Sequence, residues 1–147
     1  MKIYLDACCF NRPFDEQRSD RVIFETNAIL IILRRIDNGE IEVIGSDVLD
    51  DEIEQTPVTK KRIKLFELLK KVTIFIKLNN EIIIRGKELE MFKLKPHDSL
   101  HIASAEYGNA DVFLTVDDNI LRKYNKNPNL FHIKIINPFN FVRGEIK

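Results

Sequence analysis

The segment Lys2-Ile3-Tyr4-Leu5-Asp6 decides the predicted fold, because it is a short run of strand-forming residues that ends on a carboxylate. A turn-prone segment, Asn-Arg-Pro-Phe, follows at residues 11–14. Open α/β enzymes carry their chemistry at the carboxyl ends of buried strands, and a first strand that ends in Asp is typical of them. The start of the chain therefore predicts an α/β fold with a functional edge at Asp6.

Helix and strand patterns alternate along the rest of the chain. Further strands are predicted at residues 40–44, 72–78, 111–116 and 133–136. Helices are predicted at residues 19–37, 46–55, 59–71, 79–92, 96–107 and 118–124, with N-caps at Ser19, Ser46 and Asn79. Residues 28–33 are apolar all round, which predicts that the first of these helices is largely buried. The pattern predicts one parallel sheet of about five strands with helices on both faces.

The composition is that of an ordinary globular domain. The 147 residues are 44% hydrophobic and 31% charged, which predicts a single domain over residues 1–147. Basic and acidic residues are equal at 23 each, so any binding of nucleic acid must come from local patches. No apolar run approaches the roughly 20 residues of a membrane span, and we expect no signal peptide. The two adjacent cysteines form no disulfide framework, so we expect a cytoplasmic protein with reduced thiols.

Four carboxylates belong to one edge of the predicted sheet. Asp6 ends the first strand, and Asp117 ends the fourth. Asp98 lies in the first turn of the helix before the fourth strand, and Glu52 lies in the helix after the second. In a parallel α/β sheet, strand ends and helix starts lie at the same edge. The topology therefore predicts that all four acidic side chains meet there.

Helical phase separates Glu52 from its acidic neighbours. Val48, Leu49 and Ile53 define the inward face of this helix, and Glu52 falls within that face. An inward carboxylate is costly unless it is protonated or paired with a cation. Four carboxylates in one crevice also raise one another's pKa unless a hard divalent ion neutralises them. We therefore predict a Mg²⁺ or Mn²⁺ site.

Three of the four acidic residues also have a purely structural explanation. Asp98 favours the dipole of its helix, Asp117 suits a helix cap, and Glu52 lies in a strongly acidic run. Asp6 is the hardest to explain in this way, because nothing about a strand end requires Asp. The prediction rests on the coincidence of all four positions.

Four motifs occur in a fixed order along the chain. They are a strand ending in Asp (Ile3 to Asp6), Ser-x5-Glu (Ser46 to Glu52), Pro-x-Asp-Ser-Leu-His-Ile-Ala (Pro96 to Ala103) and hydrophobic-Thr-x-Asp (Leu114 to Asp117). In this order and spacing the chain resembles the PIN domain family from residue 2 to about residue 138. The resemblance implies a Rossmann-like fold and a Mg²⁺- or Mn²⁺-dependent endoribonuclease, as in the toxins of VapBC toxin–antitoxin pairs. It also implies RNA as substrate, an antitoxin protein as partner and a homodimer.

The resemblance assigns roles to individual positions. The matches to the family's catalytic and metal-binding quartet are Asp6, Glu52, Asp98 and Asp117, and Thr115 matches its supporting hydroxyl. Many relatives carry Thr and then Ser or Asn after the first Asp, whereas this chain has Ala7-Cys8. The outer shell of the metal then falls to other residues, for which Asn11 and Ser46 are the candidates.

For some polar residues near the predicted edge, a functional role is weighed against a purely structural one. Arg12 is a candidate for holding phosphate, with a pairing to Asp15, Glu16 or Asp20 as an equal alternative. For Arg21 the pairing with these acidic residues is favoured. His97 and His101 flank Asp98, but with only three histidines in the chain a zinc site would lack ligands.

Two other classes of protein are weighed against the nuclease. A haloacid dehalogenase-type phosphotransferase needs a second Asp two residues after the first, and Cys8 stands there. A catalytically silent PIN-like module that binds RNA or a protein is the stronger alternative. The retention of all four mutually repelling acidic residues favours the nuclease.

Overall fold

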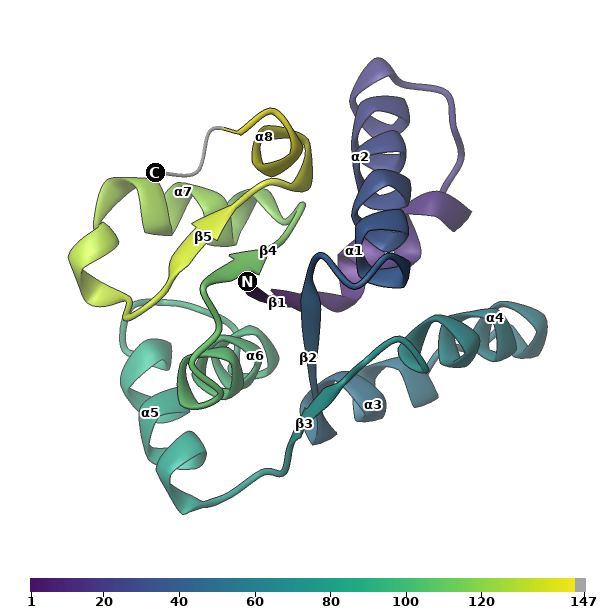
Figure 1. Ribbon diagram of the computed structural model, residues 1–147. Coiled ribbons are helices and arrows are strands. Elements are labelled where there is room, and N and C mark those ends of the chain that lie inside the picture. The colour runs from purple at the N-terminus through teal and green to yellow at the C-terminus, as the bar shows by residue number, and fades with distance from the viewer. Residues whose placement is uncertain (145–147) are drawn as a thin grey trace.

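The computed structural model describes residues 1–144 and contains one sheet of five parallel strands (Figure 1). Their order across the sheet is β3-β2-β1-β4-β5. The strands are β1 (Lys2–Leu5), β2 (Glu42–Ser46), β3 (Ile74–Ile76), β4 (Val112–Leu114) and β5 (Lys134–Ile136). The predicted α/β class with a parallel five-stranded sheet is confirmed. β1 lies at the centre, so its carboxyl end at Asp6 is flanked by the ends of β2 and β4.

Eight α-helices connect or flank the strands. They are α1 (Ala7–Asn11), α2 (Asp20–Asp37), α3 (Asp47–Glu54), α4 (Thr59–Leu69), α5 (Asn80–Glu90), α6 (Pro96–Tyr107), α7 (Asp118–Lys126) and α8 (Pro138–Val142). Short 3-10 helices lie at Arg12–Phe14 and Pro128–Leu130. The predicted N-caps are confirmed, since the side chains of Ser19, Ser46 and Asn79 each accept a backbone N–H of the following helix. These caps satisfy donors that helix geometry leaves without partners.

Two short helices were not predicted. The side chain of Asp6 accepts the N–H of Ala7 at the start of α1, and that of Asn137 accepts the N–H of Phe139 at the start of α8. Each helix spans five residues, which is too short to show a helical period in the sequence. α1 turns the chain directly after Asp6 and so fixes the backbone beside that carboxylate.

Side chains on each strand alternate between two apolar cores, one on each face of the sheet. On one face, Ile3 and Leu5 of β1 pack with residues of α1, α2, α3, α4 and α8. On the other face, Tyr4 packs with residues of α5, α6 and α7 (Figure 1). The prediction that α2 is largely buried holds for Ala28, Ile29, Ile32 and Leu33 but not for Leu30, which is 50% exposed, because only one side of α2 faces the sheet.

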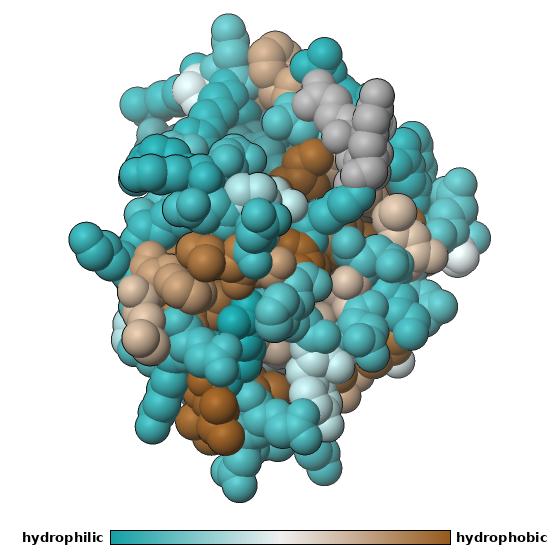
Figure 2. All heavy atoms as spheres, turned by 90° about the vertical axis from the view of Figure 1, so that its left-hand side faces the viewer, coloured by the Kyte–Doolittle hydropathy of each residue, from teal (hydrophilic) through white to brown (hydrophobic). Residues whose placement is uncertain are grey.

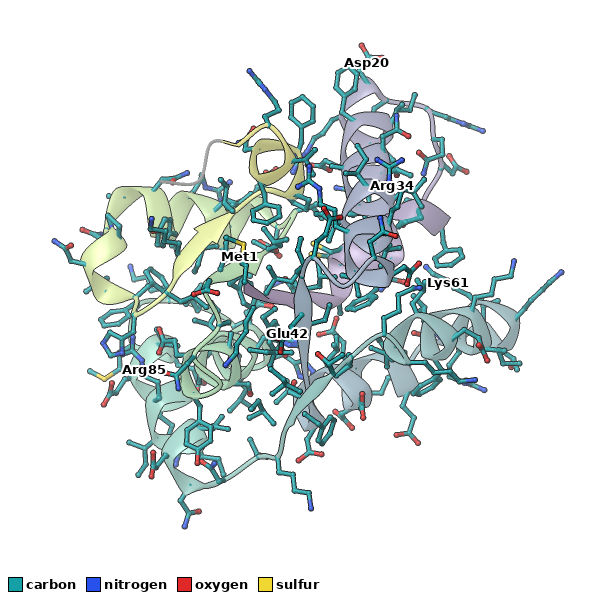
Figure 3. All side chains as sticks on the ribbon, viewed as in Figure 1. Met1, Asp20, Arg34, Glu42, Lys61 and Arg85 are labelled. Carbon is teal, nitrogen blue, oxygen red and sulfur yellow. The ribbon has the colours of Figure 1, made fainter. Side chains whose placement is uncertain are left out.

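α5 and α6 pack against each other, and an ion pair joins α5 to the last turn of α6. Arg85 of α5, labelled in Figure 3, lies 2.7 Å from the carboxylate of Glu106 on α6 and donates to the carbonyl of Leu130. Within residues 1–144, no helix has the length and apolar character needed to cross a membrane. The face shown in Figure 2 is mostly hydrophilic, with apolar side chains in small separate groups.

Candidate metal centre

Asp6 is held rigidly at the end of β1. Its side chain is 5% exposed, and Oδ1 accepts the N–H of Ala7 at 2.8 Å. Oδ2 accepts the Thr115 hydroxyl at 2.8 Å and the Cys8 thiol at 3.3 Å. These donors fix the orientation of the carboxylate. The donor from Cys8 comes from the second residue after Asp6.

Thr115 links Asp6 to Asp117. Its hydroxyl donates to Asp6 and accepts the backbone N–H of Asp117 at 3.1 Å. Asp117 Oδ1 accepts the N–H groups of Asn119 and Ile120, so this residue is the N-cap of α7. Both cap bonds fall on Oδ1. The predicted structural role of Asp117 as a cap is therefore compatible with a place at the edge of the sheet.

Asp98 lies close enough to the other acidic residues for their charges to change its ionisation. Burial raises the pKa of Asp98, and the charges of Asp6 and Asp117 raise it further, to about 6. Glu52 adds a smaller increase, which the nearby His101 opposes. Within residues 1–144, no group donates a hydrogen bond to the Asp98 carboxylate. The negative charge at this edge is therefore incompletely neutralised by the protein itself.

Glu52 has partners that the sequence did not predict. Its Oε1 lies 2.9 Å from Nε2 of His101 and 3.6 Å from Nε2 of His97. Burial acts to raise the pKa of Glu52, but the hydrogen bond with His101 and the charges of both histidines outweigh burial and lower it. The pKa of Glu52 and that of Asp98 thus shift in opposite directions at the same edge. The quartet divides into three aspartates and a glutamate that is bound to histidine.

A buried hydrogen-bond chain supports His101. The ring is 0% exposed, and its Nδ1 lies 2.7 Å from the hydroxyl of Tyr4, which in turn lies 2.6 Å from the hydroxyl of Ser46. Ser46 also accepts the N–H of Leu49 as the N-cap of α3. Ser46 therefore joins β2 to the histidine rather than to the aspartates. Asn11, the other outer-shell candidate, donates to the carbonyl of Ala7.

Both arginines near the edge are engaged by acidic side chains. Arg12 pairs with Asp15 at 3.0 Å, as its structural interpretation predicts, and with Glu25 at 2.9 Å. Arg21 pairs with Glu25 at 3.1 Å and with Asp118 at 2.8 Å, so the favoured partners predicted for it are wrong. Glu25 is 2% exposed and stands between the two arginines. It was missed because a Glu within a helix carries no sequence signal for burial.

The aspartates meet the requirements of a hard divalent ion. Asp6, Asp98 and Asp117 offer carboxylate oxygens, which Mg²⁺ and Mn²⁺ prefer. The raised pKa of Asp98 shows that these carboxylates repel one another when no ion is bound. A divalent cation relieves this repulsion, so the residues fit the predicted metal.

Comparisons with known proteins identify the fold. No protein-family profile and no curated protein matches the sequence. Among solved structures, the chain is similar to a chain of VapBC2 from Rickettsia felis bound to a DNA fragment from their promoter, with a TM-score of 0.62, 15% identity and coverage of 93% of this chain and 98% of that one. It is also similar to a chain of VapBC-1 from nontypeable Haemophilus influenzae, with a TM-score of 0.59, 15% identity and coverage of 94% and 98%. The chain therefore has the PIN-type fold that the sequence resemblance implies.

Proposed function

We propose that this chain is a Mg²⁺- or Mn²⁺-dependent endoribonuclease, with Asp6, Glu52, Asp98 and Asp117 as its acidic quartet. The proposal rests on the proximity of Asp6, Asp98 and Asp117 at the carboxyl edge of the sheet, where burial and the charges of Asp6 and Asp117 raise the pKa of Asp98 to about 6. Perturbed carboxylates gathered at the carboxyl edge of a parallel sheet are typical of catalytic sites.

Each side chain of the proposed site has a different role. Asp6, fixed by the Thr115 hydroxyl, and Asp98 and Asp117 would hold the ion. When bound, the ion lowers the pKa of a coordinated water and neutralises charge that develops on the phosphate. A bound ion would offset the repulsion by Asp6 and Asp117 that, with burial, raises the pKa of Asp98. Thr115 fixes the orientation of the Asp6 carboxylate by donating a hydrogen bond to Oδ2.

A groove between α2, α7 and α8 offers a place for part of a nucleic-acid strand. It has a volume of about 490 Å³ and is lined in part by Arg21, Phe24, Asp118 and Phe139. Phe24 is 51% exposed, and its ring stacks on that of Phe139 with centroids 5.5 Å apart. Exposed aromatic rings next to basic groups bind the bases and phosphates of single strands. This groove supports single-stranded RNA as the substrate class.

The proposed antitoxin partner rests on the two similar solved structures. Both similar structures are VapBC complexes, which supports a role for this chain as the toxin of a toxin–antitoxin pair with an antitoxin protein as partner. The proposed homodimer rests on the PIN-domain resemblance alone. Light scattering on the purified chain tests it directly, and a monomer mass at micromolar concentration contradicts it.

Cleavage of a mixed single-stranded RNA pool in Mn²⁺, Mg²⁺ or EDTA tests the activity. We expect metal-dependent cleavage by the wild type and none by Asp98→Asn. Asp51→Asn is the matched control, because Asp51 is an exposed carboxylate of α3, and it should cleave like the wild type. If the wild type binds RNA but neither cleaves it nor gains thermal stability from millimolar metal, the chain is the catalytically silent module instead.

A further inference from the structure

Three side chains next to the aspartates converge on one point. His97 and His101 stand one turn apart on α6, and Glu52 of α3 faces both. Their ligand atoms all lie within 4.8 Å of one another. Glu52 Oε1 is 2.9 Å from Nε2 of His101 and 3.6 Å from Nε2 of His97. A small displacement of these side chains would bring all three atoms into the first shell of one cation.

One of these atoms is otherwise unexplained. Nε2 of His97 is buried, although the side chain as a whole is 42% exposed, and it has no hydrogen-bond partner within residues 1–144. Buried polar atoms in folded proteins almost always have a partner, and an orphaned one calls for an explanation such as an ion. The orphaned nitrogen points at Glu52, where an ion would lie.

The hydrogen bonds around Glu52, His97 and His101 are those expected of metal ligands. Metal-bound histidines usually have their second ring nitrogen fixed by a hydrogen bond, and Nδ1 of His101 is fixed by the hydroxyl of Tyr4 at 2.7 Å. Nε2–H of His101 donates to Glu52, and a cation would take the place of that proton while Nδ1–H donates to Tyr4 and Tyr4 donates to Ser46. The buried chain therefore permits the tautomer that binding requires.

An entry path for a cation lies beside His97. A groove of about 490 Å³ borders its ring, and four carboxylates line it: Asp47, Asp50, Asp51 and Glu54. Four carboxylates along one groove give it a negative potential. Such a potential concentrates cations at the mouth of a site.

We propose that Glu52, which also belongs to the proposed acidic quartet, forms a second cation site with His97 and His101 that does not include the aspartates and is selective for a borderline ion such as Zn²⁺. Two imidazoles and one carboxylate are a recurrent zinc ligand set, and water takes the fourth position. Mg²⁺ and Ca²⁺ prefer oxygen ligands, so they should bind at the aspartates instead. The prediction that the histidines lack further ligands is thereby revised, because Glu52 supplies the third.

Zinc titration against a chromophoric chelator, with the full chain in magnesium-free buffer, tests the site. We expect one tight equivalent of Zn²⁺ per wild-type chain and binding weakened at least tenfold in His97→Gln, since loss of even a supporting partner costs roughly 10–100-fold. The matched control is His132→Gln, because His132 is 67% exposed and also faces a glutamate, Glu106. Thermal unfolding without zinc confirms that each variant is folded.

Two further variants separate this site from its neighbours. Asp98→Asn should bind zinc within a few-fold of the wild type, whereas it abolishes the proposed nuclease, so the two proposals fail independently. Cys8→Ser should also retain zinc, and X-ray absorption should show Zn–N distances of about 2.0–2.1 Å without the roughly 2.3 Å of Zn–S. Equal zinc affinity in His97→Gln and His132→Gln overturns the proposal. Loss of zinc in Asp98→Asn or in Cys8→Ser overturns it as well.

Discussion

Replacing Asp98 by Asn should stabilise the metal-free protein at neutral pH, although most substitutions of partly buried residues destabilise. Burial and the charges of Asp6 and Asp117 raise the pKa of Asp98 from 3.8 to about 6. A shift of that size corresponds to about 3 kcal/mol if each pKa unit is worth about 1.36 kcal/mol. The side chain is partly exposed, and solvent screening reduces the expected gain to about 1–2 kcal/mol.

The gain has a defined pH dependence. The folded-state pKa of Asp98 lies above its unfolded value, so between about pH 4 and pH 6 the folded protein binds more protons than the unfolded chain. The stability of the wild type, relative to that of the Asn variant, therefore falls as pH rises through this window. The stabilisation by Asp98→Asn should be close to zero near pH 4 and complete above about pH 7.

Urea unfolding in EDTA at about pH 4.5 and about pH 8 measures this effect. Asp51→Asn, an exposed carboxylate change on α3, should stay within about 0.5 kcal/mol of the wild type at both values. Adding Mn²⁺ at pH 8 should stabilise the wild type more than Asp98→Asn, because the variant lacks a ligand. A variant that is less stable than the wild type at pH 8, or a gain that does not change with pH, refutes the electrostatic argument.

Three other substitutions test the packing around the site by chemical denaturation. Tyr4→Phe removes a buried hydroxyl that two polar groups share, and should cost about 1–3 kcal/mol with little change in the unfolding m-value. Glu25→Gln weakens the pairing of the buried carboxylate with Arg12 and should cost up to about 3–5 kcal/mol, whereas a loss below 1 kcal/mol contradicts that role. Gly45→Ala places a Cβ 2.8 Å from the Val72 side chain and should cost about 1–3 kcal/mol, most of which the added change Val72→Ala should restore.

Features that depend on local signals or on topology could be predicted from the sequence. Ser19, Ser46 and Asn79 act as N-caps because their side chains act within three residues along the chain. The meeting of Asp6 with Asp98 follows from a rule that places strand ends and helix starts at one edge. Neither inference requires knowledge of side-chain rotamers.

Features that depend on the rotation of one element against another could not be predicted. The contact of Tyr4 with His101 joins residues 97 positions apart, and it depends on how α6 is rotated about its axis. The burial of Glu25 depends on α2 presenting that residue toward two arginines. Periodicity locates an apolar stripe, but it does not reveal which polar residue at the margin of the stripe finds a partner.

The opposite behaviour of Glu52 and Asp98 bears on how a metal would be held at the aspartates. The pKa of Glu52 is lowered because His101 donates to it, whereas the pKa of Asp98 is raised by burial and by two carboxylates that only repel it. To bind an ion directly among the aspartates, Glu52 would have to give up its 2.9 Å contact with His101. Asp98 gives up no hydrogen bond within residues 1–144 and loses a repulsion. Because Mg²⁺ keeps several waters and takes only one or two carboxylates, we infer that the direct ligands come from among the three aspartates and that Glu52 acts on this ion through water.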